Sequence, residues 1–471
     1  MLEHAGLAYL RTFPDFELGN VSAAQTFGLE RVLALLEEVG APHLRVPVIH
    51  IAGTKGKGST AASVASILRA AGYRTGMFTQ PHLVRLNERF QIDGVEITDD
   101  QLSAIMLSQI QPAMARLVAR GITGVQQFEA QVTLAFLWFE AQATDVVVLE
   151  VGLGGRLDGT NVVPKPVVST ISPIGFDHMA ILGDTLPLIA GEKAAIIKEG
   201  VPVVASPQPV EAETVLIKMS RRMHAALYLG GRDWEATAVR TTLQGTTFDL
   251  RFSPSALPDD AQRNGVISIN NLHEDGQLSL MALRTPLLGA HQAVNAACAA
   301  VTAIVASRSL TRIDADAIRQ GLAMAEWPGR LQVIDNEPTV IVDGAHTAES
   351  AEVLVSAIKE LFPGKRVVVV CGIQGDKDIP NVVTPLAKLA ASVVATRAHH
   401  QRAASTAVIA AAFSDAGSVV VQECEEPLAA VDRARRLAGR DAIVLVTGSL
   451  YLVGDVLVGS RSDFLEPTGV L

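Results

Sequence analysis

A short apolar segment that ends in a glycine-rich loop constrains the fold of this chain most strongly. Residues Val46 to Ala52 form the apolar run, and the loop Gly53 to Thr60 follows it directly. Small and apolar residues then recur at helical spacing from Ala61 to Ala71, and Gly72 stands where a helix commonly ends. The order strand, loop, helix predicts an α/β fold, in which helices connect the strands of a parallel sheet.

The alternation of strands and helices continues along the first half of the chain. Buried strands are predicted at Asp145 to Val151, Val167 to Ile171 and Val201 to Ala205. Helical patterns cover Phe128 to Ala143 and Leu186 to Glu199. We therefore expect a mostly parallel sheet that is covered by helices on both faces.

The sequence changes in character between Trp234 and Leu288. Thr246 to Phe252 and Val266 to Ile269 are strand-like and are separated by turn residues, which predicts a small β insertion. Helical patterns return from His291 to Ser307 and from Asp314 to Glu326.

The segment Trp327-Pro328-Gly329-Arg330 interrupts this helical pattern and predicts a domain boundary. We place one domain at residues 1–327 and a second, smaller α/β domain of Rossmann-like architecture at residues 328–471. Its predicted strands are Val340 to Val342, Arg366 to Cys371, Ser392 to Thr396 and Ile443 to Val446.

The overall composition is typical of a globular protein that works inside the cell. Of the 471 residues, 49% are hydrophobic, which is enough to form two cores, and the net charge of -10 argues against general nucleic-acid binding. No apolar run reaches the roughly 18 residues of a membrane span, and the first residues do not resemble a secretory signal. The three cysteines lie far apart and are expected to be reduced thiols. We expect a cytoplasmic monomer without a membrane or nucleic-acid partner.

The loop after the first strand has the chemistry of a phosphate-binding loop. Gly53, Gly56 and Gly58 allow the loop, which also contains Thr54, to curl so that its N–H groups point at phosphate oxygens, and the start of the helix adds positive potential. The Lys57 ammonium would reach the β- and γ-phosphates, and a hydroxyl of Ser59 or Thr60 could contact them or a magnesium ion. The loop departs from the general nucleotide-binding pattern, because Ile51 replaces its first glycine. A nucleotide site is the prediction.

The pattern Gly-Thr-X-Gly-Lys-Gly-Ser resembles the loop of the folylpolyglutamate and dihydrofolate synthases, which belong to the Mur-ligase superfamily. The resemblance runs nearly from end to end of the chain. It implies a P-loop-containing central ATPase domain with a small β insertion and a smaller C-terminal domain. It also implies ATP and two magnesium ions as cofactors, and folate and L-glutamate as substrates.

Several expected metal and catalytic residues follow from the resemblance. Glu150 at the end of a predicted strand and His178 in Phe-Asp-His match the magnesium ligands of the family. Gln80 stands where most relatives have a serine that binds magnesium, and its amide oxygen is suited to a hard cation. Lys193 matches a lysine that is carbamylated in the family. The expected catalytic group is Lys57, Glu150, His178 and Lys193, and the expected metal ligands are Gln80, Glu150 and His178.

The second half of the chain supplies further family positions. Asn295, Arg330, Asp343 and His346 match residues that contact the nucleotide. Arg402 could hold a carboxylate of the substrate, and the substrate position of Ser449 is implied in the same way. The motifs Gly372 to Asp378 and Thr447 to Tyr451 complete the series.

The expected folate pocket contains two departures from bifunctional relatives. The segment Gln126-Gln127-Phe128-Glu129 keeps the Phe-Glu of the family but lacks a threonine found near the pterin in bifunctional relatives, and Gly159 replaces an alanine. Both differences weaken the case for dihydropteroate as a second substrate. Lys55 and Thr347 differ from the commonest bacterial residues and resemble variants found in folylpolyglutamate synthases.

The resemblance thus implies ATP-dependent addition of L-glutamate to the γ-carboxyl group of folate through an acyl phosphate. The alternatives are a bifunctional dihydrofolate synthase and another Mur-type amide ligase. A P-loop GTPase or kinase is a poorer match, because no guanine-reading Asn-Lys-X-Asp segment occurs in the sequence. A nucleotide-binding regulator without catalysis is a further alternative, which the replacement at Gln80 raises.

Overall fold

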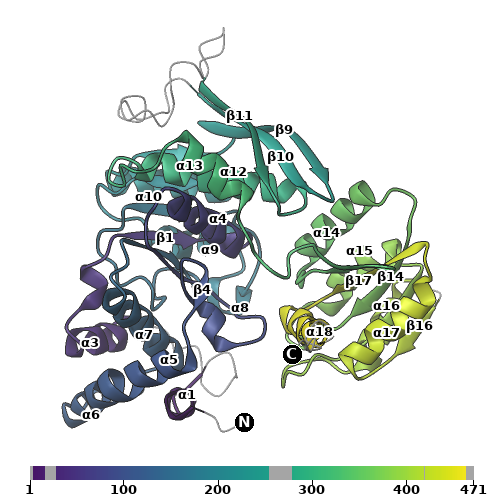
Figure 1. Cartoon of the computed structure of the whole chain (residues 1–471), viewed down its shortest axis with the longest axis horizontal. Helices are drawn as coiled ribbons and strands as arrows, with labels where there is room; N and C mark the ends of the chain where they lie inside the picture. Colours follow the sequence, from purple (N-terminus) through teal and green to yellow (C-terminus); the bar gives the residue numbers. More distant parts are fainter. Residues whose placement is uncertain (1–3, 16–27, 254–277, 418–419, 463–471) are drawn as a thin grey trace, which may run out of the picture.

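The computed structural model describes residues 4–15, 28–253, 278–417 and 420–462. They form two α/β bodies that lie side by side, and Figure 1 shows the larger at the left and the smaller at the right. We call the part from α1 to α13 the central domain and the part from β12 to α18 the C-terminal domain. No helix in these described ranges is long and apolar enough to cross a membrane.

The central domain is built on an eight-stranded sheet in the order β4-β3-β2-β5-β1-β6-β7-β8. Its middle strand β1 (Val48–Ala52) pairs in parallel with β5 (Val146–Glu150) and β6 (Val168–Ile171). Only the β2-β3-β4 edge is antiparallel. The other strands are β2 (Thr75–Phe78), β3 (Phe90–Ile92), β4 (Val95–Glu96), β7 (Val203–Ala205) and β8 (Leu227–Leu229).

Helices cover both faces of this sheet, because its strands carry apolar side chains on both sides. Ile49 and Ile51 of β1 belong to the core beneath α4 (Lys57–Ala70), α12 (Ala290–Ala306) and α13 (Ala315–Ala323). Val48 belongs to the core on the opposite face. The helices before α12 are α1 (Ala5–Leu10), α3 (Glu30–Glu38), α5 (Asp99–Ile105), α6 (Gln111–Ala119), α7 (Gln127–Ala141), α8 (Met179–Leu182), α9 (Leu186–Ala194) and α10 (Val210–Arg222), with the short turns η1 (Pro42–Leu44), η2 (Leu86–Arg89) and η3 (Met106–Ile110).

The β insertion is a separate three-stranded antiparallel sheet in the order β11-β10-β9. It consists of β9 (Trp234–Thr242), β10 (Gly245–Phe252) and β11 (Leu278–Thr285), and it lies over α12 in Figure 1. Phe248 and Leu250 are buried against α12 residues in the same core, which explains why the alternating pattern of β10 faces inward. The predicted strand Val266 to Ile269 lies outside the described residues.

The C-terminal domain contains a six-stranded sheet in the order β12-β13-β17-β14-β15-β16, in which only the β12–β13 pair is antiparallel. Its strands are β12 (Gln332–Asn336), β13 (Thr339–Val342), β14 (Arg366–Cys371), β15 (Ser392–Ala395), β16 (Val421–Glu423) and β17 (Ala442–Thr447). Its helices are α14 (Ala348–Leu361), α15 (Ile379–Leu389), α16 (Thr406–Asp415), α17 (Pro427–Ala438) and α18 (Leu450–Ser462).

The expected two-domain α/β architecture is therefore confirmed. The boundary at residues 327 and 328 falls between α13 and β12 and stays a prediction. One expected helix is shorter than its apolar pattern suggested, since α9 ends at Ala194 and not near Glu199. The Glu192 carbonyl accepts the backbone N–H of Arg156 at 2.9 Å, while Ile196 turns its N–H to Lys193. In a continuing α-helix the Ile196 N–H would bond to the Glu192 carbonyl. Because Arg156 occupies that carbonyl, the helix ends here.

Candidate active site

A cavity of about 610 Å³ lies between the two domains. The carboxyl ends of β1, β2 and β5 meet it from one side, and the segments that follow β13, β14 and β17 meet it from the other. Ligands of open α/β sheets bind at these strand ends. The cavity is lined by most of the predicted site residues, namely Thr54, Gly56, Lys57, Gly58, Ser59, Gln80, Phe128, Glu150, His178, Asn295, Arg330, Asp343, His346, Arg402 and Ser449.

Four predicted residues, Gly53, Thr60, Gly159 and Lys193, are not part of the lining. Thr60 is completely buried inside α4, and Lys193 is 4% exposed. The Lys193 ammonium donates a hydrogen bond to the Gly53 carbonyl at 2.8 Å and so helps to fix the start of the loop. Burial, followed by the nearby charge of Lys57, lowers the pKa of Lys193 to about 7.

The glycine-rich loop requires glycine because other groups pack directly against its backbone. Gly56 precedes α4 with a left-handed φ of 76°, and a Cβ atom there would lie 2.3 Å from Oδ1 of Asn295. A Cβ atom on Gly58 would lie 2.4 Å from the ring of Trp327. In the sequence, Trp327 stands out only as part of the segment that interrupts the helical pattern. Its position beside the loop could not be inferred from a sequence separation of 269 residues.

The first half of the loop is held by the protein itself. The backbone N–H groups of Thr54 and Lys55 both donate to the Pro173 carbonyl at 3.0 Å, and the Thr54 hydroxyl donates to Gly175 at 3.1 Å. The first N–H groups of a helix have no acceptor within that helix. The start of α4, from Lys57 to Ser59, is therefore the part of the loop best suited to phosphate oxygens.

Glu150 and Gln80 come together at the ends of β5 and β2. The Glu150 side chain is 2% exposed and accepts the Gln80 backbone N–H at 3.2 Å. The Gln80 side chain lies against Gly152, where a Cβ atom would meet its amide at 2.6 Å. Burial raises the pKa of Glu150 to about 7, although the charge of Lys57 opposes this shift.

The oxygen groups at this point suit a magnesium ion that is shared with a bound phosphate. No three His, Cys, Asp or Glu side chains converge on a metal position within the described part of the chain. Magnesium in phosphate sites usually takes one or two protein carboxylates and completes its shell with water and substrate oxygens. The buried Glu150 carboxylate beside the Gln80 amide fits that requirement.

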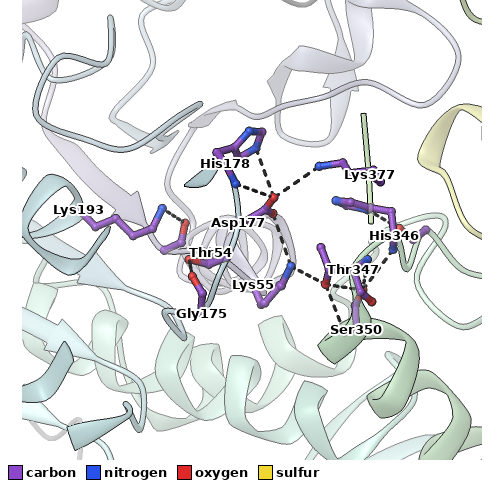
Figure 2. Close-up of polar contacts among 12 residues, drawn as sticks. Thr54, Lys55, Gly175, Asp177, His178, Lys193, His346, Thr347, Ser350 and Lys377 are labelled. Atoms are coloured by element: carbon purple, nitrogen blue, oxygen red, sulfur yellow. Dashed lines mark hydrogen bonds and ion pairs between the residues drawn. The ribbon is translucent and has the colours of Figure 1, made fainter. Parts of the chain in front are cut away.

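His178 forms part of a charged cluster between the domains. Its neighbour Asp177 lies 3.5 Å from the Lys55 ammonium and 3.4 Å from the Lys377 ammonium of the C-terminal domain. Lys55 also donates to the Thr347 hydroxyl at 2.9 Å. Figure 2 shows how Asp177 points between the two lysines. These contacts connect the nucleotide loop with the start of α14.

The electrostatics of this cluster follow from its enclosed position. Burial disfavours ionisation of Asp177, but the charges of Lys55, His178 and Lys377 outweigh this effect and hold its pKa far below the usual range. The His178 ring keeps 44% of its surface exposed within the cleft. The surrounding protein still displaces water from it and lowers its pKa to about 4. The ring is therefore neutral near pH 7 and can act as a ligand.

The C-terminal wall places Asp343 and His346 directly after β13. The two Asp343 oxygens accept the backbone N–H groups of Leu331 and Ala345, both at 2.8 Å, and this fixes the segment that carries Arg330. The His346 ring lies 2.8 Å from the Gly344 carbonyl through Nδ1. Burial, followed by the charges of Lys377 and Lys55, lowers the pKa of His346 to about 4.

Arg402 and Ser449 lie further along the same wall. The Arg402 guanidinium is 3.6 Å from the Asp376 carboxylate, and its side chain is 37% exposed. The Ser449 hydroxyl accepts the Tyr451 backbone N–H at 3.1 Å at the start of α18. Arg402 therefore presents a cation to the cavity wall, where it is paired with Asp376.

Phe128 reaches the cavity from the start of α7, and Gly159 lies behind it. A Cβ atom on Gly159 would lie 3.3 Å from the Phe128 ring, so an alanine would push against the aromatic wall. Asp158, which precedes Gly159, is buried and accepts hydrogen bonds from Leu153 and Thr160. The absence of a side chain at Gly159 thus leaves room for the Phe128 ring, which lines the cavity.

Comparison with known proteins agrees with this arrangement. Residues 51–303 match the family model of the Mur ligase middle domain, and residues 329–450 match that of the Mur ligase, glutamate ligase domain. A dihydrofolate synthase/folylpolyglutamate synthase of Bacillus subtilis is 35% identical over 432 residues, which cover 91% of this chain and 94% of that protein.

Solved structures show the same overall similarity. A folylpolyglutamate synthase of Mycobacterium tuberculosis complexed with ADP and AMPPCP superimposes with a TM-score of 0.83 at 30% identity, over 97% of this chain and 99% of that one. A solved FPGS–AMPPCP–folate complex superimposes with a TM-score of 0.79 at 29% identity, over 99% and 100% of the two chains. The chain therefore belongs to the folylpolyglutamate synthase/dihydrofolate synthase family of Mur ligases, and it is an ATP-dependent ligase.

Proposed function

We propose that this protein adds L-glutamate to the γ-carboxyl group of a folate, with ATP as the source of energy. The observation that carries the proposal is the cavity on which the glycine-rich loop, the buried Glu150 carboxylate and the cations Arg330 and Arg402 converge. It is supported by the similarity to a solved complex of FPGS with AMPPCP and folate. A folate carboxylate, a triphosphate and L-glutamate all carry net negative charge and repel one another, and this cavity offers neutralising cations from both domains.

In the first step, the γ-carboxylate of the folate attacks the γ-phosphorus of ATP. A bond forms between the carboxylate oxygen and phosphorus, the bond to the β,γ-bridging oxygen breaks, and ADP leaves. An anion must approach a polyanion, so neutralising positive charge is the main requirement. Lys57 would serve the β- and γ-phosphates, and Arg330 would serve the nucleotide from the C-terminal side.

In the second step, the amino group of L-glutamate attacks the carbonyl carbon of the acyl phosphate. The new amide bond replaces the carbon–oxygen bond to phosphate, and the amine loses a proton as phosphate leaves. Arg402 would hold a carboxylate of the amino acid near Ser449, while Phe128 and Gly159 would shape the folate end of the cavity. Enclosure between the two domains would protect the acyl phosphate from hydrolysis.

We also propose that two magnesium ions accompany ATP. Glu150, Gln80 and His178 would hold them, with Asn295, Asp343 and His346 around the nucleotide. When bound, these ions would spread the charge of the transferring phosphoryl group. The protein is proposed to act as a cytoplasmic monomer. One chain lines the cavity from both sides, and the three cysteines are free, as is usual in a reducing compartment.

The proposal is tested by incubating the protein with ATP, L-glutamate and either tetrahydrofolate or dihydropteroate. Product with tetrahydrofolate alone supports the proposal, and product with both acceptors supports the bifunctional alternative. Lys57→Ala should reduce product formation by about 100-fold or more, because it removes a charge that stabilises phosphoryl transfer. Mass spectrometry of the folate product measures both results.

The exposed Lys359 of α14 gives the matched control, and Lys359→Ala should retain the wild-type rate. If neither tetrahydrofolate nor dihydropteroate gave a glutamylated product, the proposed substrate would be refuted. Near-normal turnover by Lys57→Ala would refute the role of the loop.

Carbamylation of Lys193 is a further part of the proposal. Only a neutral amine adds to carbon dioxide, with formation of an N–C bond and loss of one proton. Because the pKa of Lys193 is lowered to about 7, the neutral fraction rises between pH 6 and pH 8. A carbamate signal should therefore grow over this range in ¹³C NMR spectra recorded with ¹³C-bicarbonate, and Lys193→Arg should lack it. A wild-type spectrum without the signal at pH 8 would contradict carbamylation.

A further inference from the structure

The side chain of Gln374 is enclosed and finds no hydrogen-bond partner among the residues that the structure describes. Gln374 follows β14 at the cavity wall and is 5% exposed. Its amide nitrogen and oxygen are both buried, and neither forms a hydrogen bond with any described residue. An enclosed amide without partners is unfavourable, because it has lost its hydrogen bonds to water. A polar group in this state at a cavity wall is suited to a polar group of a ligand.

The position of Gln374 is fixed by the backbone. Gly375 donates its N–H to the Arg402 carbonyl at 2.7 Å, and Ala404 donates its N–H to the Ile373 carbonyl at 2.9 Å. Gln374 itself forms a β-bridge with Ala403. The segments that follow β14 and β15 are thus joined, and Gln374 and Arg402 are held as neighbours.

Arg402 contributes one enclosed atom of the same kind. Its Nε atom is buried and forms no hydrogen bond within the described ranges, while a terminal nitrogen lies 3.6 Å from Asp376. The two side chains together offer N–H donors from a guanidinium, N–H donors from an amide, and one amide oxygen. An α-amino acid requires the complementary set, because its carboxylate accepts hydrogen bonds and its amino group donates them.

We propose that Gln374 is a specificity-determining residue that orients the incoming L-glutamate. Its Nε2 donates to a carboxylate of the glutamate that Arg402 also holds, and its Oε1 accepts one N–H of the α-amino group. The lone pair of the amine is then left free to face the acyl phosphate. This inference rests on the proposed function and adds the recognition of the amino acid to it.

The test compares steady-state kinetics of the wild type, Gln374→Leu and Gln374→Glu. Leucine removes both hydrogen-bonding atoms at similar volume, so the KM for L-glutamate should rise about 10- to 100-fold, as for a lost hydrogen bond to a charged group. The Gln374→Glu side chain keeps a hydrogen-bond acceptor but places a negative charge beside the carboxylate of the substrate. The KM of this variant for L-glutamate should therefore rise at least as much. The KM values for ATP and tetrahydrofolate should stay within about twofold of the wild type.

Gln422→Leu in β16, outside the cavity lining, is the matched control and should leave all three KM values unchanged. The inference is overturned if Gln374→Leu keeps the wild-type KM for L-glutamate. It is also overturned if all three KM values and the thermal midpoint shift together, since that pattern indicates a structural role, or if Gln374→Glu equals the wild type. A wild type that forms no glutamylated folate overturns the proposed function, whereas an active wild type with an unaffected Gln374→Leu overturns the recognition role alone.

Discussion

Among single residues, His50 shows how strongly the central sheet restricts ionisation. It lies in the middle of β1, is completely buried, and contacts the Thr160 hydroxyl at 2.9 Å through Nε2. Burial, followed by the charge of Lys198, lowers its pKa from 6.5 to about 3. The alternating face of β1 that carries His50 is otherwise apolar, so the neutral ring is part of the core.

This burial predicts a specific dependence of stability on pH. The unfolded chain takes up a proton on His50 below pH 6.5, whereas the folded protein does so only near pH 3. The contribution of the neutral His50 ring to the free energy of unfolding is therefore fully present above pH 6.5. It is lost as the pH falls toward 3, by at most about 1.4 kcal/mol per pH unit. The thermal midpoint of the wild type should therefore decrease more steeply between pH 6.5 and 5 than that of His50→Gln. Parallel curves for the two proteins would contradict this explanation.

At the level of single elements, α14 connects local helix capping with the site. Its first helical turn is capped by the Thr347 hydroxyl, which accepts the Ser350 N–H at 3.3 Å and also receives the hydrogen bond from Lys55. One side chain thus stabilises the helix start and contacts the nucleotide loop.

Thr347→Ala should loosen the start of α14, because loss of a cap costs about 1 kcal/mol. Hydrogen exchange of peptides from residues 347–361, followed by mass spectrometry, should be faster in this variant. Thr347→Ser keeps the hydroxyl and should exchange at nearly the wild-type rate. Equal protection in Thr347→Ala and the wild type would show that the cap is dispensable.

The elements that the sequence predicted correctly are those with long apolar patterns or glycine punctuation. The strand, loop and helix around Lys57 were predicted because all three parts are adjacent in the chain. The antiparallel edge of β3 and β4 was not predicted, since Phe90–Ile92 and Val95–Glu96 are too short to show a period. The helix predicted from apolar periodicity was longer than α9, because periodicity contains no information on the hydrogen bond from the Arg156 N–H that ends the helix.

At the scale of the whole molecule, the domains are connected by charges that no local pattern could reveal. Lys55 and Thr347 are 292 residues apart in sequence, and Asp177 and Lys377 are 200 apart. The family motifs predicted that these segments belong to one site. They did not predict the contacts of Asp177, the proximity of Trp327 to Gly58, or the enclosed amide of Gln374.

The ion pair between Asp177 and Lys377 should favour the closed arrangement of the domains. Both side chains are mostly buried, at 14% and 19% exposed, so Lys377→Met should shift the protein toward more open forms. Small-angle X-ray scattering should show a larger radius of gyration for this variant at low salt. High salt should reduce the difference, because it screens the pair in the wild type.

Lys365→Met, which removes an exposed lysine of the same domain, should scatter like the wild type. An unchanged radius of gyration in Lys377→Met at every salt concentration would refute a role of this ion pair in closure.

The indole of Trp327 against Gly58 gives the molecule an intrinsic optical probe. The other two tryptophans, Trp138 and Trp234, are buried in two different cores of the central domain. Trp327 alone borders the start of α4, where a change in local polarity reaches its ring directly. The emission of this protein therefore reports on the state of the loop without any attached dye.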